Sequence, residues 1–228
     1  MILVTGGAGY IGSHCVMALL EQNNDVVIFD NLSTGHIETV ETLKKYGHVE
    51  FQKGDLTNFA DINSVFKNYD IDKVVHFAAF SQVGESVVNP QKYYINNVCG
   101  TINLLRAMLE NNVKKIVFSS TAATYGEPEN TPILEDDKTI PTNAYGESKL
   151  LVEKILKWCD TCYGIKFTVL RYFNAAGAHI NGKIGEDHSP ETHLIPLILQ
   201  VALNKRDEIM IFGDDYKTKD GTCVRDYI

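Results

Sequence analysis

The first twelve residues run from a short apolar strand through closely spaced glycines into a helical pattern. Read from Gly7, the glycines fit the spacing G-x-G-x-x-G; they are Gly6, Gly7, Gly9 and Gly12. Glycines at such a turn let backbone N–H groups approach a pyrophosphate, and the positive end of the following helix dipole attracts the same anion. The opening of the chain therefore predicts a dinucleotide-binding turn.

A second apolar segment leads directly to Asp30. This acid lies 18 residues beyond Gly12, at a distance where dinucleotide-binding folds carry a carboxylate that holds a ribose 2′-hydroxyl. No Arg or Lys follows Asp30 closely to pair with a 2′-phosphate. The sequence therefore favours NAD over NADP as the cofactor.

Short apolar segments alternate with helical patterns along the chain. The expected strands are Ile2–Thr5, Val26–Asp30, Val49–Lys53, Lys73–Ala78, Lys115–Ser119 and Phe167–Tyr172. The expected helices lie near residues 11–22, 59–68, 91–111 and 145–162. This alternation predicts an α/β fold, a doubly wound parallel sheet of the Rossmann type with helices on both faces. Ligands of such sheets gather beyond the carboxyl ends of the strands.

The character of the sequence changes after Asn174. A loop-rich stretch over residues 175–191 precedes an apolar helix expected at Leu194–Leu203 and a strand expected at Glu208–Phe212. We therefore expect an NAD-binding domain at residues 1–173 and the start of a smaller, partial substrate-binding region at residues 174–228.

The composition excludes several classes of protein. A net charge of −8 argues against general binding to nucleic acid or anionic membranes. No apolar run approaches the length of a membrane span, and the glycine turn follows Met1 too closely for a leader peptide, so we expect a cytoplasmic protein. The pair Cys159-x-x-Cys162 resembles a redox or zinc motif, but it lies in an expected helix without a second pair, so we interpret both as ordinary helix cysteines.

A tyrosine and a lysine with a spacing of four follow the strand that ends at Thr121. The spacing puts Tyr145 and Lys149 on one face of a helix. A tyrosine is a poor base at neutral pH, and we expect the nearby ammonium, together with the positive nicotinamide of NAD⁺, to lower its pKa. Tyr145 can then take a hydroxyl proton as hydride leaves the adjacent carbon, while Thr121 hydrogen-bonds the same substrate oxygen.

Taken together, the motifs resemble the extended short-chain dehydrogenase/reductase family, and within it most closely the UDP-glucose 4-epimerases. The resemblance runs from end to end of the chain. The matching segments are Val4-Thr-Gly-Gly-Ala-Gly-Tyr-Ile-Gly-Ser-His14, Asp30-Asn-Leu-Ser33, Gly54-Asp-Leu56, His76-Phe-Ala-Ala79, Val83-Gly-Glu-Ser86, Tyr93-Tyr-Ile-Asn-Asn-Val98, Ala144-Tyr-Gly-Glu-Ser-Lys149, Arg171-Tyr-Phe-Asn174 and Val224-Arg-Asp-Tyr227.

The resemblance implies an isomerase of galactose metabolism that interconverts UDP-glucose and UDP-galactose. Tyr145 is implied to remove the 4-hydroxyl proton, and C4 hydride is implied to pass to NAD⁺ and return to the other face of a transient 4-keto sugar. The resemblance also implies a homodimer formed through two helices, here 91–111 and 145–162.

The resemblance further implies a set of site residues. Those implied to catalyse are Thr121, Tyr145 and Lys149. Those implied to hold NAD, besides the catalytic pair and the turn glycines, are Tyr10, Ile11, Asp30, Asn31, Asp55, Leu56, Phe77, Ala78, Ala79, Ser81, Asn96 and Phe173. Ser81 stands where some family members carry a lysine, so one cofactor contact is expected to differ. Those implied to hold the UDP-sugar are Thr121, Asn174, His193, Leu194, Phe212 and Arg225. An arginine also suits a diphosphate on physical grounds.

Two alternative functions make different demands on the sequence. A sugar-nucleotide 4,6-dehydratase shares the fold and the first hydride step, but that family carries an Asp-Glu pair where this chain has Ala122 and Ala123. A non-catalytic NAD-binding sensor can lose the tyrosine or the lysine, and this chain has both. Because the family usually extends further than Ile228, we expect these 228 residues alone to bind NAD but to show little epimerase activity.

One acidic and histidine-rich segment has the composition of a metal-ligand set. It comprises Glu186, Asp187, His188, Glu191 and His193. The segment lies in the loop-rich stretch where the family places sugar-nucleotide contacts. We therefore expect a loop that lines the substrate cleft, and no metal.

Overall fold

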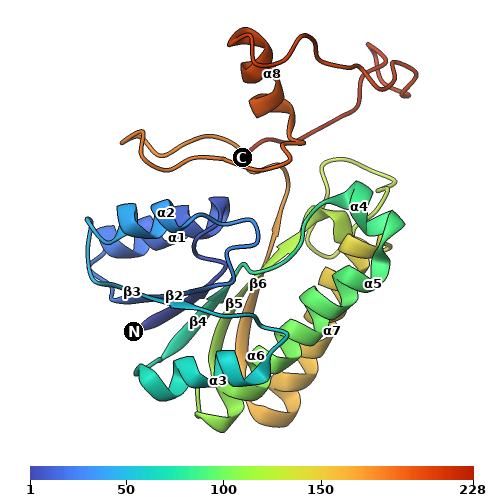
Figure 1. The fold of residues 1–228 in the computed structure, drawn as a ribbon. Helices are drawn as coiled ribbons and strands as arrows, with labels where there is room; N and C mark the ends of the chain where they lie inside the picture. The colour runs from blue at the N-terminus through green and yellow to red at the C-terminus, as the bar shows by residue number, and fades with distance from the viewer. The chain divides into compact units, whose positions relative to one another are not determined.

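The computed structural model describes residues 1–228, which form an alternating series of strands and helices (Figure 1). In chain order the elements are β1 (Ile2–Thr5), α1 (Tyr10–Glu21), β2 (Val26–Asp30), α2 (Ile37–Leu43), β3 (Val49–Lys53), α3 (Phe59–Asn68), β4 (Lys73–His76), α4 (Val83–Val88), α5 (Pro90–Tyr93), a π-helical segment (Tyr94–Cys99), α6 (Gly100–Glu110), β5 (Lys115–Thr121), a 3₁₀ turn (Ala122–Thr124), α7 (Ala144–Tyr163), β6 (Lys166–Tyr172) and α8 (Leu194–Ala202).

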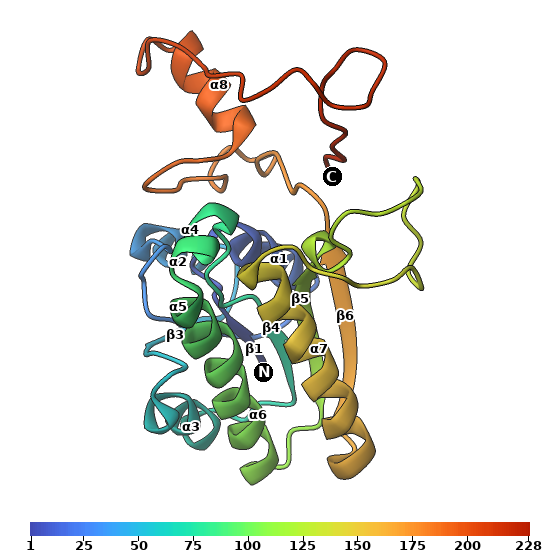
Figure 2. The ribbon, with the colours of Figure 1, turned by 90° about the vertical axis from the view of Figure 1, so that its right-hand side faces the viewer.

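All six strands form one parallel sheet in the order β3-β2-β1-β4-β5-β6. Helices α1 and α2 cover one face of this sheet, and α3, α6 and α7 cover the other (Figure 1). Figure 2 shows α5, the π-helical segment and α6 following one another alongside α7. The predicted doubly wound parallel sheet is therefore confirmed.

The buried strands explain why the sheet forms. Every residue of β1 and β2 is buried, and both strands read as nearly continuous apolar runs, as expected when helices cover both faces. On one face the core joins Leu3 and Phe118 of the sheet to Leu104 and Met108 of α6 and Leu156 of α7. This packing fixes the helices that carry the candidate catalytic residues against the strands.

The strand order puts the topological switch between β1 and β4. From β1 the chain winds outward through β2 to β3, then crosses to the other side of β1 to form β4. The backbone N–H groups of Phe77 and Ala78 both donate to the carbonyl oxygen of Thr5, at 2.9 and 3.1 Å. These bonds hold the segment after β4 beside the glycine turn, where ligands of such folds bind.

Some element boundaries differ from those expected. Strand β4 ends at His76 rather than Ala78, and β5 continues to Thr121. The short helices α2 and α4 were not expected, and the expected helix over 91–111 contains a π-helical segment. The strand expected at Glu208–Phe212 is wrong, because these residues pair with no strand and the Ile211 and Phe212 side chains are exposed.

The chain divides into two compact units, Met1–Tyr172 and Phe173–Ile228. The first contains the sheet and helices α1 to α7. Within the second, Asn174 and Tyr227 form a parallel bridge, with hydrogen bonds from Asn174 N to Asp226 O and from Ile228 N to Asn174 O. None of the helices is both long enough and apolar enough to cross a membrane.

Candidate nucleotide and catalytic site

The glycine turn after β1 is built for close approach. Gly6 adopts a φ of +72°, and a Cβ there would lie 2.6 Å from the backbone nitrogen of Ala78. A Cβ at Gly12 would overlap the carbonyl oxygen of Gly6. Both glycines are therefore required by the fold itself, which needs the turn to pack against β4 and α1.

Gly9 differs from its neighbours in what surrounds it. A Cβ at Gly9 would meet only the Gly6 carbonyl oxygen, at an ordinary 3.5 Å. The fold therefore leaves room for a side chain at this position. Gly9 is also the N-cap residue of α1, whose first turn carries no acidic side chain. The first backbone N–H groups of the helix, including those of Tyr10 and Ile11, thus form a site for an anion that comes close to the chain.

Asp30 at the end of β2 faces this turn. Its Oδ2 accepts a hydrogen bond from Ala8 N at 3.1 Å, and its Oδ1 accepts one from Leu32 N at 2.8 Å. Burial raises the pKa of Asp30, and these two hydrogen bonds act in the opposite direction. The carboxylate is thereby held at the carboxyl edge of the sheet, and each oxygen keeps a further lone pair for a ligand hydroxyl.

The neighbouring strand places Asp55 next to Asn31. Asn31 donates through Nδ2 to Asp55 Oδ2 at 2.9 Å, and Thr57 donates to Asp55 Oδ1 through both its backbone nitrogen and its hydroxyl. Burial alone would raise the pKa of Asp55, but these hydrogen bonds outweigh it and lower the pKa. Leu56 is buried against α6. The ends of β2 and β3 thus bring together three predicted cofactor residues, which are Asn31, Asp55 and Leu56.

The segment after β4 is clamped by a buried asparagine that sequence reasoning did not single out. Asn97 accepts a hydrogen bond from Phe80 N at 2.9 Å and donates to Phe80 O at 3.0 Å and to Ser148 Oγ at 3.2 Å. The predicted cofactor residue Asn96 donates to Asn97 Oδ1. The clamp ties the segment that carries Ala79 to α7, and it sits in the π-helical segment, a geometry common at functional sites.

A second buried link joins β1, β4 and α6 through His76. Its Nδ1 lies 2.6 Å from Thr5 Oγ1 and its Nε2 lies 2.8 Å from Thr101 Oγ1. Thr101 donates its only hydroxyl proton to Asn97 O, so it accepts from Nε2, and Thr5 donates to Nδ1. Burial, followed by the charge of Lys149, lowers the pKa of His76 to about 3. The imidazole is therefore neutral and acts as a fixed connector.

Thr121, Tyr145 and Lys149 lie together at the carboxyl end of β5 and the start of α7. Asn143 caps α7 by accepting from Gly146 N at 2.8 Å, which orients the first turn that carries Tyr145. Lys149 Nζ lies 6.0 Å from the centroid of the Tyr145 ring, and the Thr121 hydroxyl lowers the pKa of the Tyr145 phenol against the effect of burial. The structure therefore brings the three predicted catalytic residues together.

The pKa shifts of this trio follow from burial. Burial raises the pKa of Tyr145, and the Thr121 hydroxyl acts against this rise. The lowered pKa expected from the sequence includes the positive charge of bound NAD⁺ and stays a prediction. Burial also lowers the pKa of Lys149 to about 7, and its ammonium donates to Ser119 O at 2.8 Å. The cause is desolvation, which disfavours the charged forms of both groups when no other charge lies nearby.

An ion pair further along α7 was also missed by sequence reasoning. The buried Glu153 accepts hydrogen bonds from Arg171 Nε at 3.1 Å and Nη2 at 2.6 Å, and from Ser120 Oγ. Glu153 lies four residues after Lys149, on the same face of the helix. The pair fixes α7 against β5 and β6 and so supports the position of the catalytic trio. Only the tertiary fold reveals it, because its members are 18 and 33 residues apart.

Ser81, the residue after the clamped Phe80, is exposed. The remaining predicted residues belong to the second unit. The parallel bridge between Asn174 and Tyr227 brings the segment of Asn174 beside that of Arg225. His193 is the N-cap residue of α8, and Leu194 is its first residue. Phe173 is 38% exposed and Phe212 is 95% exposed. The structure thus joins two of the predicted substrate segments and leaves Phe212 without packing.

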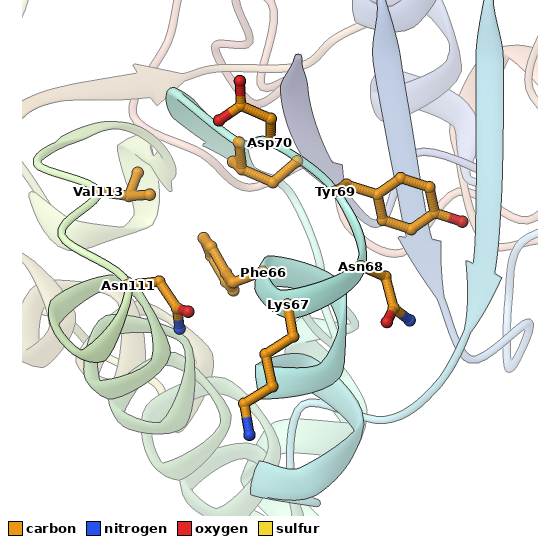
Figure 3. Close-up of a pocket in the computed structure, with 8 residues that line it drawn as sticks. Phe66, Lys67, Asn68, Tyr69, Asp70, Asn111 and Val113 are labelled. Atoms are coloured by element: carbon orange, nitrogen blue, oxygen red, sulfur yellow. The ribbon is translucent and has the colours of Figure 1, made fainter.

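A pocket of about 340 Å³ lies away from these residues, at the amino edge of the sheet (Figure 3). It is lined by the segment from Phe66 to Ile71, which leads into β4, and by Asn111 and Val113, which lead into β5. Figure 3 shows the Tyr69 ring turned away from Phe66 and Val113. Because ligands of doubly wound sheets bind at the opposite, carboxyl edge, this pocket is not part of the candidate site.

Comparison with known proteins identifies the family. A family model described as GDP-mannose 4,6 dehydratase matches residues 3–228. A UDP-glucose 4-epimerase of Halalkalibacterium halodurans is 59% identical over 227 residues, which is 100% of this chain and 66% of that protein. A UDP-glucose 4-epimerase of Lacticaseibacillus casei is 56% identical, over 100% of this chain and 67% of that protein.

Solved structures give the same result. UDP-glucose 4-epimerase from Brucella ovis in complex with NAD matches with a TM-score of 0.93 and 46% identity, over 100% of this chain and 68% of that one. The Bifidobacterium longum enzyme in complex with NAD⁺ and UDP matches with a TM-score of 0.96 and 42% identity, over 100% of this chain and 69% of that one. The chain thus spans about two thirds of the length of these relatives, and it belongs to the UDP-glucose 4-epimerase family.

Proposed function

We propose that this protein catalyses the NAD-dependent 4-epimerisation of UDP-hexoses and interconverts UDP-glucose and UDP-galactose through a transient 4-keto sugar. The observation that carries the proposal is the placement of Tyr145 beside Lys149, whose Nζ lies 6.0 Å from the centroid of the tyrosine ring. It places an acid–base group at the same sheet edge as the glycine turn and Asp30. The relatives named above are UDP-glucose 4-epimerases, and two of their structures contain NAD or NAD⁺.

The first unit, within the domain proposed at residues 1–173, fits NAD. The open space over Gly9 and the first turn of α1 suit a pyrophosphate, and the Asp30 carboxylate suits a ribose hydroxyl. Asn31 and Asp55 support that edge through their mutual hydrogen bond. NAD, when bound, supplies the acceptor and donor of hydride at C4 of the sugar.

Tyr145 is the proposed base for the 4-hydroxyl proton. Its raised pKa keeps the phenol protonated in the chain alone. A positive charge close to the phenol stabilises the phenolate and so lowers this pKa. Lys149 is poised to supply part of that charge, because its pKa of about 7 allows it to be protonated near neutral pH. Thr121 then holds the substrate oxygen in line with the phenol.

The UDP-sugar is proposed to contact the second unit. Asn174 and Arg225 lie on the two bridged segments, and an arginine guanidinium binds diphosphate oxygens in a bidentate manner. His193 and Leu194 start α8 and are assigned to the same ligand, together with Phe212. Thr121 is assigned to the sugar itself.

Two alternatives are weaker. A 4,6-dehydratase is suggested by the description of the family model, but it requires an acid and a base next to Thr121, and this chain has Ala122 and Ala123 there. A non-catalytic sensor does not require the Tyr145 and Lys149 arrangement. A homodimer is proposed from the family resemblance, and the exposed Ile102 and Trp158 on α6 and α7 suit such a contact.

The product of the reaction tests the proposal. The relatives are about half as long again as this chain, so the assay compares two proteins. One is this chain alone. The other is a chimera in which this chain is followed by the C-terminal third of the Halalkalibacterium halodurans enzyme, which is 59% identical to it over the shared part. With NAD and UDP-galactose, we expect the chimera to form UDP-glucose of unchanged mass and the chain alone to form little. A product lighter by one water would instead identify a dehydratase, and NAD binding without any product would support the sensor.

A further inference from the structure

The loop before α8 brings four metal-ligating side chains together. Glu186, His188, Glu191 and His193 each offer one ligand atom, and these atoms all lie within 4.8 Å of one another. The two carboxylate side chains are only 10% and 7% exposed, and that of His188 is 26% exposed. The set lies wholly inside the second unit. Asp187, the fifth residue of the segment, is not part of it.

Two of the separations between the ligand atoms suit a tetrahedral metal. Bonds of about 2.0–2.2 Å to nitrogen and oxygen place neighbouring ligand atoms of a tetrahedron roughly 3.3–3.6 Å apart. His188 Nδ1 lies 3.3 Å from Glu186 Oε1 and 3.6 Å from Glu191 Oε2. His193 Nδ1 lies 3.0 Å from Glu186 Oε1 and 2.8 Å from Glu191 Oε1. The two His188 distances match those between two ligands of one ion, and the shorter contact between His193 and Glu191 is a hydrogen bond that a bound ion would replace.

The charges of the cluster also favour a cation. The Glu186 and Glu191 side chains are mostly buried, and both carboxylates contact the same two imidazoles. Two buried carboxylates held this close repel each other unless positive charge lies between them.

We propose that Glu186, His188, Glu191 and His193 bind one divalent transition-metal ion of the zinc class. Two imidazole nitrogens with two carboxylate oxygens form a mixed set that suits zinc, whereas magnesium and calcium prefer oxygen ligands alone. Four protein ligands close the coordination sphere, which is typical of a structural rather than a catalytic site. The sequence analysis expected a cleft-lining loop without metal, and this proposal departs from that expectation.

The site fastens the loop to the start of α8. All four ligands lie within residues 186–193, and His193 is the N-cap residue of the helix. The bound ion fixes the position from which α8 begins and so the orientation of Leu194. The metal therefore has a structural role in the second unit and takes no part in the chemistry at Tyr145.

Metal titration tests the proposal directly. The chain is stripped with a chelator, freed of chelator, and titrated with Zn²⁺ by calorimetry at pH 7.5. We expect one ion per chain and at least a hundredfold weaker binding of Mg²⁺. Glu191→Gln and His188→Gln should each weaken Zn²⁺ binding at least tenfold, because each removes one ligand of four.

The matched control is His48→Gln. His48 lies on the surface between Asp25 and Glu50, at 3.2 and 3.4 Å, and thus has two carboxylates but no second imidazole. This variant should bind Zn²⁺ with unchanged affinity. The exposed thiols of Cys99, Cys162 and Cys223 are rival ligands, and binding through them would persist in the Glu191 and His188 variants.

Cobalt provides a readout that does not depend on the folding of a variant. Co²⁺ added to the unaltered protein should give the visible absorption of a four-coordinate ion with nitrogen and oxygen ligands, and Zn²⁺ should abolish it. The absence of saturable Zn²⁺ binding, an octahedral cobalt spectrum, or equal affinity in the unaltered protein and both ligand variants would each overturn the proposal.

Discussion

Lys149 is a buried lysine whose charge affects the stability of the chain. It is 3% exposed, its ammonium has the Ser119 carbonyl as a hydrogen-bond partner, and its pKa falls to about 7. Between this value and the unfolded value of 10.5, the unfolded chain binds more protons than the folded one. Stability therefore rises with pH across this window, and the burial of the charge costs stability at and below pH 7.

Replacing Lys149 with Met should remove this cost. We expect Lys149→Met to be more stable than the unaltered chain at pH 7, and to lose a rise in stability on the order of 2 kcal/mol between pH 7 and pH 9. Urea denaturation at the two pH values measures this difference. The exposed Lys45→Met serves as control and should behave like the unaltered chain. A pH dependence that survives in Lys149→Met would mean that the lysine is not the group responsible.

Asp30 should decide the choice between NAD and NADP. Its carboxylate is fixed by Ala8 and Leu32, and a 2′-phosphate brought to it would meet like charge. We expect the unaltered chain to bind NAD at least tenfold more tightly than NADP. The Asp30→Ala variant should bind NAD more weakly, and its preference for NAD over NADP should be smaller. Calorimetric titration with both cofactors measures these affinities. Asp25→Ala, an exposed acid before the same strand, is the control. Tighter binding of NADP by the unaltered chain would disprove this role for Asp30.

The site residues differ in how far the sequence could predict them. Tyr145 and Lys149 share a helix face by local spacing alone, so their proximity follows from the sequence. The His76 connector joins residues 71 positions apart, and Asn97 reaches Ser148 across 51 positions. Contacts of that kind depend on which helix packs on which strand, and no local pattern records them.

Among the elements, the π-helical segment has the clearest link to function. Its Asn97 is buried and fastens Phe80, hence the segment from Phe77 to Ser81, to α7. Removing that side chain would leave the partly buried Phe80 backbone groups without these partners. Each lost hydrogen bond costs about 1 kcal/mol, and an unsatisfied buried group costs more.

We therefore expect Asn97→Ala to lose about 2–4 kcal/mol of stability and roughly tenfold in NAD affinity. Denaturation and calorimetry measure the two effects. Asn68→Ala, at the exposed end of α3, should change neither. Unchanged NAD affinity in a folded Asn97→Ala protein would show that the segment after β4 does not contribute to the cofactor site.

The elements themselves were largely predictable, and the exceptions have physical causes. Buried parallel strands such as Val26–Asp30 are almost entirely apolar, here up to the final Asp30, so they stand out in the sequence. Helix α2 has only seven residues, so its three apolar positions, Ile37, Val40 and Leu43, span less than the window of about 11–18 residues over which a helical period is recognised. The segment 208–212 has the apolar composition of a strand, but a strand also needs a neighbour to pair with, and composition does not reveal one.

At the scale of the whole molecule, the two units differ in how much they bury. The first has a continuous core, whereas α8 in the second has no buried residue, and its Leu194, Ile198 and Leu199 side chains are about half exposed. Contiguous exposed apolar groups promote association. The activity of the chain alone is expected to be limited by this second unit and not by the nucleotide-binding unit.

The chain should therefore self-associate as its concentration rises. We expect Leu199→Lys to reduce this association, since it places a charge in the middle of the exposed apolar face of α8. Sedimentation velocity over a range of concentrations follows the change, with Ala202→Lys at the end of the same helix as the control for charge alone. If both proteins sediment as the unaltered chain does, α8 is not the surface responsible.

The most direct test of the whole account is the turnover of the chimera with Tyr145 intact and with Tyr145→Phe. Loss of a general base costs on the order of 10²–10⁴ in rate. We predict that Tyr145→Phe converts UDP-galactose to UDP-glucose at least a hundredfold more slowly and binds NAD with unchanged affinity, as measured by a coupled assay and calorimetry on the same preparations. Comparable turnover of the two proteins would contradict the assignment of Tyr145 as the base on which the mechanism rests.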